Sequence, residues 1–181
     1  MHSRNEPLLP QVFPDGLLRR LRQSDLAAFQ AYRAIPELGR FQNWSPMSEA
    51  DALAFLSVMS DAPLFTPGEW VQLGIAESDT NYLIGDVGLF LSADGFAGTV
   101  GFTLAPSSQG RGIATSAVRR ALQVFFRATS ARQVQGITDG RNAASIRLLE
   151  RIGFRHHETR TAVFRGEECS ERIYFLPRND S

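Results

Sequence analysis

Three features of the sequence indicate a single α+β domain with a mostly antiparallel sheet flanked by helices. The chain has 181 residues, of which 43% are hydrophobic, a size and composition typical of one globular domain. Residues 70–104 alternate with the period of strands and are broken by two short polar turns. Residues 113–126 and 142–152 instead show helical spacing, with one strand-like segment between them.

The beginning of the chain is rich in proline. Residues 1–16 contain three prolines and little periodicity, so we expect an extended lead-in to one domain over residues 17–177. That domain begins with a strand over Leu17–Leu21. Met1–Asn5 is polar and has no signal-peptide pattern, and no apolar stretch in the chain approaches the length of a membrane span.

Two helices are expected next. Ser24 or Asp25 can cap a first helix, which Pro36 ends because proline denies the following turn a backbone donor. Ser48 begins an acidic variant of the capping box and caps a second helix with an apolar face.

A three-stranded antiparallel meander follows, and strands then alternate with helices. The third strand of the meander runs into a glycine-rich turn and a long amphipathic helix. A later helix over Asn142–Ile152 is closed by Gly153. Strands are expected over Trp70–Glu77, Tyr82–Leu91, Phe96–Leu104, Gln133–Thr138, Thr159–Phe164 and Arg172–Leu176.

Charge and cysteine content exclude several classes of function. All 19 basic residues are Arg, so the chain has neither a Schiff-base lysine nor a P-loop lysine. They balance 19 acidic residues, so no overall positive field draws the chain to nucleic acid or a membrane. One cysteine and three histidines provide neither a disulfide framework nor a Cys/His zinc cluster. We expect a cytoplasmic protein without a metal.

The charge is divided unevenly along the chain. Residues 1–108 contain 6 Arg and 12 acidic residues, whereas residues 109–181 contain 13 Arg and 7 acidic residues. This division favours an anionic ligand on the second half and a cationic acceptor on the first. A dipolar surface that binds no ligand would have the same composition.

A glycine-rich turn joins the meander to the long helix at Gln109–Ala114. Gly110 and Gly112 permit unusual backbone angles and close approach of a ligand, and the helix N-terminus beside them favours a phosphate. Arg111 adds a charged donor. A turn that only redirects the chain is the alternative interpretation.

Two other nucleotide-binding motifs fit this turn poorly. A Rossmann fingerprint requires Gly or Ala where this chain has Thr115, and an acidic residue about 20 positions further on. The next acidic residue is Asp139. A Walker loop requires a lysine, which the chain lacks.

The pattern Gln-x-x-Gly-x-Ala at Gln109–Ala114, preceded by Val100–Pro106, resembles the acetyl-CoA signature of the GCN5-related N-acetyltransferase (GNAT) superfamily. Asn142–Ser145 and Leu148–Phe154 resemble the Asn-x-x-Ser and Gly-Phe pattern of its RimJ/RimL-type branch, which includes ribosomal-protein N-terminal acetyltransferases. The resemblance covers Leu17–Leu176. It implies a GNAT fold, in which a twisted, mixed, mostly antiparallel sheet is flanked by helices and a splayed strand pair holds acetyl-CoA.

The resemblance also implies which residues hold acetyl-CoA. The pyrophosphate would lie on the amides of the glycine turn, and pantetheine would pair with the strand before it. Asn142 would contact the cofactor, although a helix cap is an equally good role for it. The implied cofactor-binding residues are Phe102, Thr103, Leu104, Gln109, Gly110, Arg111, Gly112, Ile113, Ala114, Thr115, Asn142 and Ser145.

Direct attack of a neutral amine on the thioester is the implied reaction, and it requires no enzyme nucleophile. By resemblance, a backbone N–H near Leu104 is the oxyanion donor, and Ser145 is the candidate donor to the leaving thiolate. Leu149 stands where many members of the superfamily place a Tyr general acid, and Thr99 where many place a glutamate base.

The general base is therefore left open. Glu77 or Asp86 could orient a water molecule that takes the ammonium proton, but a solvated carboxylate on a strand face is the favoured role for each. Cys169 lies outside the matched motifs, so we expect an inert thiol rather than an acyl carrier.

Three further sets of residues are candidates for a role at the site. Trp44, in the loop between the first two helices, is the implied substrate-binding residue, with core packing as its alternative role. Arg147 and Arg151 either reach the 3′-phosphate of CoA or form an exposed cationic face, the favoured interpretation. His156 and His157 are expected at the surface and receive no role.

Together these expectations describe an acetyl-CoA-dependent N-acetyltransferase. The acceptor would be an amine-bearing small molecule, such as a polyamine or an aminoglycoside, or the N-terminus of a peptide or protein. The resemblance also makes a homodimer reasonable. Thr99 and Leu149 motivate the main alternative, a non-catalytic acyl-CoA-binding regulatory module.

Overall fold

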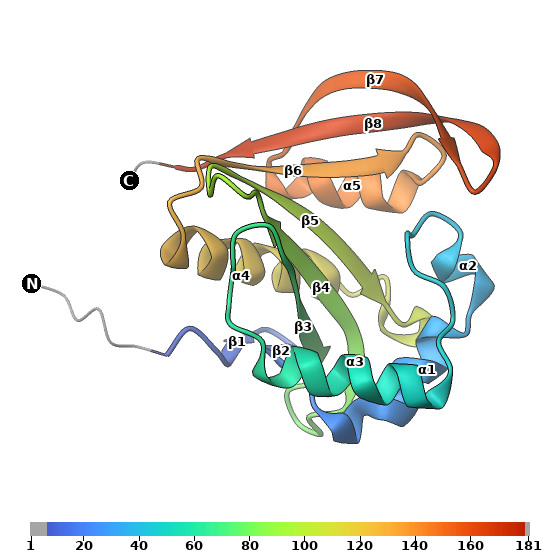
Figure 1. Cartoon of the computed structure of the whole chain (residues 1–181), viewed down its shortest axis with the longest axis vertical. Coiled ribbons are helices and arrows are strands. Elements are labelled where there is room, and N and C mark those ends of the chain that lie inside the picture. Colours follow the sequence, from blue (N-terminus) through green and yellow to red (C-terminus); the bar gives the residue numbers. More distant parts are fainter. Residues whose placement is uncertain (1–6, 180–181) are drawn as a thin grey trace, which may run out of the picture.

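Eight strands form one sheet in the computed structural model, which describes residues 7–179 (Figure 1). The sheet order is β1-β2-β3-β4-β5-β6-β8-β7. The strands are β1 (Gln11–Phe13), β2 (Gly16–Arg20), β3 (Trp70–Ala76), β4 (Leu83–Leu91), β5 (Ala97–Leu104), β6 (Gln133–Asp139), β7 (Arg155–Phe164) and β8 (Glu167–Pro177). The helices are α1 (Leu26–Arg33), α2 (Pro36–Gly39), α3 (Glu49–Asp61), α4 (Ile113–Ala128) and α5 (Ala143–Ile152).

One parallel pair interrupts the antiparallel sheet. β5 and β6 pair only from Ala97 with Gln133 to Val100 with Gly136. Beyond these residues both strands continue for several positions, and Figure 1 shows them diverging. The predicted mixed, mostly antiparallel sheet with a splayed strand pair is therefore confirmed.

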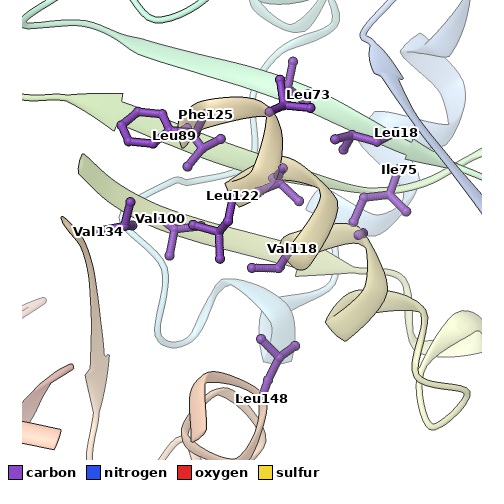
Figure 2. Close-up of a cluster of buried hydrophobic side chains, with 14 of the residues drawn as sticks. Leu18, Leu73, Ile75, Leu89, Val100, Val118, Leu122, Phe125, Val134 and Leu148 are labelled. Atoms are coloured by element: carbon purple, nitrogen blue, oxygen red, sulfur yellow. The ribbon is translucent and has the colours of Figure 1, made fainter. Parts of the chain in front are cut away.

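Helix α4 covers one face of the sheet. Its buried side chains Leu122 and Phe125 pack with Leu89 of β4 and Val100 of β5 in the main hydrophobic core (Figure 2). The apolar residues of α4 recur at helical spacing, so they form one stripe that faces the strands. Burying each such Leu or Phe side chain contributes about 1.5–3 kcal/mol, and this packing fixes the start of α4 next to the end of β5.

Helices α1 and α3 cover the opposite face. Phe29 and Tyr32 of α1 pack with Leu56 of α3 in a second hydrophobic cluster. Ser48 caps α3 as predicted, because its side chain accepts a hydrogen bond from the Asp51 amide at 3.1 Å. The sheet therefore has an α4 face and an α1/α3 face.

Some helices and strands begin or end at other residues than the sequence predicts. Residues 1–6 of the expected lead-in lie outside the described residues, and within the remainder Gln11–Phe13 forms β1 against β2. Pro36 does not mark the end of the first helix, which stops at Arg33; it occupies the first turn of α2, where its missing donor costs nothing. Strands β7 and β8 begin earlier than predicted, because polar residues on exposed strands hide the period-2 signal.

Candidate active site

The glycine turn leads directly into the N-terminus of α4. Gly110 and Gly112 have φ angles of +78° and +79°, in the left-handed region that favours glycine. Gly112 is the N-cap of α4 and has no side chain with which to cap it. The first amides of the helix, from Ile113 to Thr115, are consequently left for a ligand, and the helix dipole favours an anionic one.

The backbone of Leu104 points into the gap between β5 and β6. The amide of Ala105 donates to the carbonyl of Ile84 on the β4 side at 2.7 Å. In an antiparallel ladder the preceding residue directs its N–H and C=O the opposite way, toward the gap. Gln109 agrees with this geometry, because its Nε2 donates to the Leu104 carbonyl at 2.9 Å. The N–H of Leu104 therefore faces the space where β5 and β6 separate.

A cavity of about 630 Å³ lies along this gap, and we call it the glycine-loop cavity. Glu37 and Leu38 of α2 form part of its wall, and Arg147 and Arg151 of α5 lie at its border. Arg111 is exposed and lies outside this lining. The predicted cofactor-binding residues that the structure brings together here are Phe102, Thr103, Leu104, Gln109, Gly110, Gly112, Ile113, Ala114, Thr115, Asn142 and Ser145.

Asn142 and Ser145 lie at the start of α5. The Asn142 side chain accepts a hydrogen bond from the Ser145 amide at 3.2 Å, so Asn142 caps the helix and also borders the cavity. Leu149, one helical turn further on, is buried against β6. A Cβ atom at Gly136 would lie only 2.7 Å from Leu149 Cδ2. Position 149 is therefore part of the core and faces neither cavity.

A second cavity of about 640 Å³ lies on the α1/α3 face, and we call it the sheet-face cavity. Four residues line both cavities, namely Phe41, Gln42, Phe102 and Thr103. Gln42 donates from Nε2 to the Phe102 carbonyl at 3.1 Å, so it spans the junction. A group held in one cavity can meet a group held in the other at Phe102 and Thr103.

Asp86 is a buried carboxylate in the wall of the sheet-face cavity, and the expectation of a solvated strand-face residue is wrong. Its side chain is 1% exposed and receives Arg33 Nη2 at 3.0 Å and Gln72 Nε2 at 2.5 Å. The Tyr32 hydroxyl also donates to it. Burial, followed by the Asp86 charge, raises the pKa of Tyr32 well above its usual value, so Tyr32 stays protonated.

Trp44 lines the sheet-face cavity and also contacts Arg33. The guanidinium of Arg33 lies 4.5 Å from the centre of its ring, which is a cation–π contact. Arg165, at the turn between β7 and β8, donates to the carbonyls of Gln42 at 3.0 Å and Trp44 at 2.7 Å. This hairpin therefore holds the loop that carries Gln42 and Trp44 over the sheet.

Two titratable groups lie at the β8 side of the same cavity. The hydrogen bonds from Arg141 hold the pKa of Asp139 below its usual value, and Arg141 Nη2 lies 2.8 Å from Asp139 Oδ2. Burial, followed by the nearby Asp139 charge, raises the pKa of the Cys169 thiol. A thiol with a raised pKa is a poor nucleophile at neutral pH.

The remaining predicted residues lie apart from the junction. Glu77 follows β3 and accepts a hydrogen bond from the Thr80 hydroxyl at 2.6 Å, outside the linings of both cavities. His156 and His157 are exposed on β7, as predicted. Arg147 and Arg151 are exposed, as the favoured interpretation predicts, and both also border the glycine-loop cavity.

Sequence reasoning did not single out Arg33, Gln42 or Gln72. One sequence signal indicates the hydrogen bonds around Asp86: this residue is the lone charge in the otherwise apolar strand β4. A lone carboxylate in an apolar strand is more often buried with a partner than solvated. The partner itself could not be inferred, since Arg33 is 53 residues away in the sequence.

Within residues 7–179, no group of three or more His, Cys, Asp or Glu side chains is arranged to hold a metal ion. Over the same residues, no helix combines the length and the apolar character that a membrane crossing needs.

Comparison with known proteins identifies the fold and the family. The family described as "Acetyltransferase (GNAT) domain" matches residues 17–155. An uncharacterized N-acetyltransferase, p20 of Bacillus licheniformis, is 22% identical over 139 residues, which are 76% of this chain and 77% of that protein.

Solved structures agree with this match. A GNAT-family acetyltransferase from Bacillus anthracis superposes with a TM-score of 0.81 at 17% identity, over 93% of this chain and 97% of that one. RimL, a ribosomal L7/L12 alpha-N-protein acetyltransferase in complex with coenzyme A, superposes with a TM-score of 0.80 at 16% identity, over 94% of this chain and 98% of that one. The chain belongs to the GNAT family of N-acetyltransferases, and its fold is that of the RimL-type enzymes.

Proposed function

We propose that this enzyme transfers the acetyl group of acetyl-CoA to the primary amine at the N-terminus of a protein or peptide. The observation that carries the proposal is the junction of the two cavities at Phe102 and Thr103. The cofactor would lie in the glycine-loop cavity, and the amine would arrive through the sheet-face cavity. The RimL likeness supports a peptide acceptor.

The amides of Ile113, Ala114 and Thr115 would bind the pyrophosphate of acetyl-CoA. They lie at the uncapped N-terminus of α4, beside two glycines at which an added Cβ would meet nothing within 4 Å. Backbone amides and a helix dipole together favour a phosphate there. Arg147 and Arg151 border the same cavity and would supply positive charge for the 3′-phosphate of CoA.

Leu104 and Ser145 would act on the thioester. As the amine nitrogen forms its bond to the carbonyl carbon, negative charge develops on the carbonyl oxygen, and the Leu104 N–H is directed to stabilise it. The C–S bond then breaks, and the Ser145 hydroxyl donates a hydrogen bond to the leaving thiolate. The nitrogen loses its extra proton to solvent, and the products are an amide and CoA.

Transfer to a panel of amines tests the proposal. The enzyme is incubated with acetyl-CoA and with peptides, polyamines or aminoglycosides, and both CoA thiol and acetylated product are measured. We expect equal amounts of the two products with peptide acceptors. Acetylation of polyamines or aminoglycosides alone would replace the peptide acceptor with a small-molecule one.

A non-catalytic acyl-CoA-binding module is the second candidate function. Leu149 favours it, because the position that many superfamily members use for a Tyr general acid is buried in the core here. This candidate requires acetyl-CoA binding with no transfer to any amine. Product formation with one amine would eliminate it.

We also propose that the enzyme acts in the cytoplasm without a metal and forms a homodimer. The single cysteine supports a reducing compartment, and direct amine attack needs no metal. The dimer is supported by the family resemblance, and sedimentation of the purified chain tests it.

A further inference from the structure

The floor of the sheet-face cavity contains a glycine trough. In the strand register Gln72 of β3 is opposite Gly88 of β4, and Gly88 is opposite Gly101 of β5. Side chains at paired positions project from the same face of a sheet. All three residues line the sheet-face cavity. Two consecutive positions of this row therefore have no side chain to fill the space above the strands.

The two glycines differ in what lies above them. A Cβ at Gly101 would meet nothing within 4 Å, so the floor is open there. A Cβ at Gly88 would lie 2.7 Å from Gln72 Oε1, so the Gln72 amide fills that position. The trough is open over β5 and closed over β4 by the amide of Gln72.

The orientation of the Gln72 amide is fixed by Asp86. Its Nε2 donates to Asp86 Oδ1 at 2.5 Å. A carboxylate that also pairs with Arg33 accepts hydrogen bonds only, so the amide cannot turn its oxygen toward Asp86. Gln72 Oε1 is therefore held over Gly88, where it can receive a hydrogen bond from a donor on a ligand.

The neighbouring row of the floor is aromatic. Trp70 is opposite Phe90, which is opposite Thr99. The Trp70 and Phe90 ring centres are 5.5 Å apart, and Trp70 is 48% exposed. On the other side of the trough, Thr103 marks the junction with the glycine-loop cavity. The trough thus runs between an aromatic wall and the place where the amine would react.

We propose that the acceptor carries an aromatic ring with a hydrogen-bond donor, as in a phenol or an indole, close to its primary amine. The amine lies at Thr103, the ring lies over Gly101 beside Phe90, and its O–H or N–H donates to Gln72 Oε1. Thr103 and Gln72 are two strands apart, roughly 10 Å, a span that suits such a group. This inference rests on the proposed N-acetyltransferase function.

A comparison of paired acceptors tests the hydrogen bond. Initial rates are measured with tyramine and phenethylamine, and with peptides that begin with Tyr, Phe, Trp, Ser or Ala. We expect the tyramine rate at low concentration to exceed the phenethylamine rate by about tenfold or more, because Gln72 Oε1 would otherwise lose its partner. The peptide arm shows whether the ring belongs to a free amine or to an N-terminal residue.

Gln72→Met tests whether Gln72 distinguishes tyramine from phenethylamine. The variant keeps a side chain of similar length but removes the amide oxygen. We expect the tyramine to phenethylamine ratio to fall to about one. A ratio measured within one variant is insensitive to a general loss of folded protein. An unchanged ratio would overturn the role of Gln72.

Gly101→Val tests the trough. The added side chain points into open space, so it should narrow the trough without disturbing the strand. We expect kcat/KM for aromatic acceptors to fall by about tenfold or more, with the Kd for acetyl-CoA unchanged. Ala97→Val is the matched control. Ala97 lies on β5 and faces the same side of the sheet, but it is outside the cavity lining. In this variant, kcat/KM for aromatic acceptors and the Kd for acetyl-CoA should both stay at their wild-type values.

The outcomes separate this inference from the proposed function. Preferred transfer to peptides that begin with Tyr or Trp supports both. Transfer to tyramine without transfer to any peptide supports the aromatic acceptor and replaces the peptide of the proposed function with a small amine. Efficient transfer to Ser or Ala peptides, with no advantage for a ring, overturns the aromatic acceptor and leaves the N-acetyltransferase function intact. Binding of acetyl-CoA without transfer to any acceptor overturns both.

Discussion

Arg33 Nη2 donates a hydrogen bond to Asp86 Oδ2 at 3.0 Å, and the two side chains are 7% and 1% exposed. Burying two charges costs desolvation energy, so a buried ion pair often adds little net stability. Here the pair lies in the wall of the sheet-face cavity and fixes the Gln72 amide. The role of this ion pair is best explained by the fixed orientation of the Gln72 amide in the cavity wall.

Asp86→Asn should lower the free energy of unfolding by about 3 kcal/mol or more, because it leaves the Arg33 charge buried without a partner. Urea denaturation of the wild type and the variant measures the change. The double variant Arg33→Met/Asp86→Leu removes both charges and should be more stable than Asp86→Asn. A loss below about 1 kcal/mol in Asp86→Asn would show that this ion pair is solvated.

Gly112→Asp should weaken acetyl-CoA binding, because it places a carboxylate where the pyrophosphate is expected and an L side chain where φ is +79°. Gly95→Asp is the matched control. Gly95 also has a positive φ, of +71°, and open space above it, but it lies in the turn between β4 and β5. Calorimetric Kd values should rise only for Gly112→Asp. Equal affinities in the two variants would argue against the glycine turn as the phosphate site.

Ser145→Ala should lower kcat by about tenfold or more and change the Kd for acetyl-CoA little, if the hydroxyl assists the leaving thiolate. The helix cap remains intact, because Asn142 bonds the backbone amide of residue 145 rather than its side chain. Steady-state rates at saturating substrates provide the measurement. A wild-type kcat would assign Ser145 to packing alone.

Cys169→Ala should leave kcat within about threefold of wild type, because direct amine attack uses no acyl-enzyme. In the wild type, burial raises the pKa of the Cys169 thiol, so iodoacetamide should react slowly at pH 8 and rapidly after denaturation. The unfolded chain loses this proton at a lower pH than the folded one. Cys169 therefore lowers stability as pH rises through the thiol pKa of the unfolded chain. Loss of transfer in Cys169→Ala would indicate covalent catalysis.

Local sequence signals predicted several elements of the fold, including the glycine turn. The Ser48 cap, the strand meander and the glycine turn depend on neighbouring residues, and each appears where it was expected. The glycine turn was found because positive φ angles and a helix start leave a compositional trace.

The sheet-face cavity is much harder to predict, because it depends on strand register and on contacts between distant residues. The sequence predicts a solvated Asp86, whereas in the structure Arg33 and Tyr32 of α1 bond to it in the interior. Gly101 became informative only once its alignment with Gly88 and Gln72 was known. A period-2 pattern indicates which residues share a face of one strand, but it does not indicate which residues of two strands are opposite each other.

Calorimetric titration of the wild-type protein with acetyl-CoA, and in parallel with NAD, examines the assignment on which the other proposals depend. The glycine turn and the start of α4 should bind acetyl-CoA at one saturable site per chain and give no heat with NAD. Absence of acetyl-CoA binding would mean that Gln109–Ala114 only redirects the chain. Saturable binding of NAD would mean that the turn recognises a dinucleotide instead.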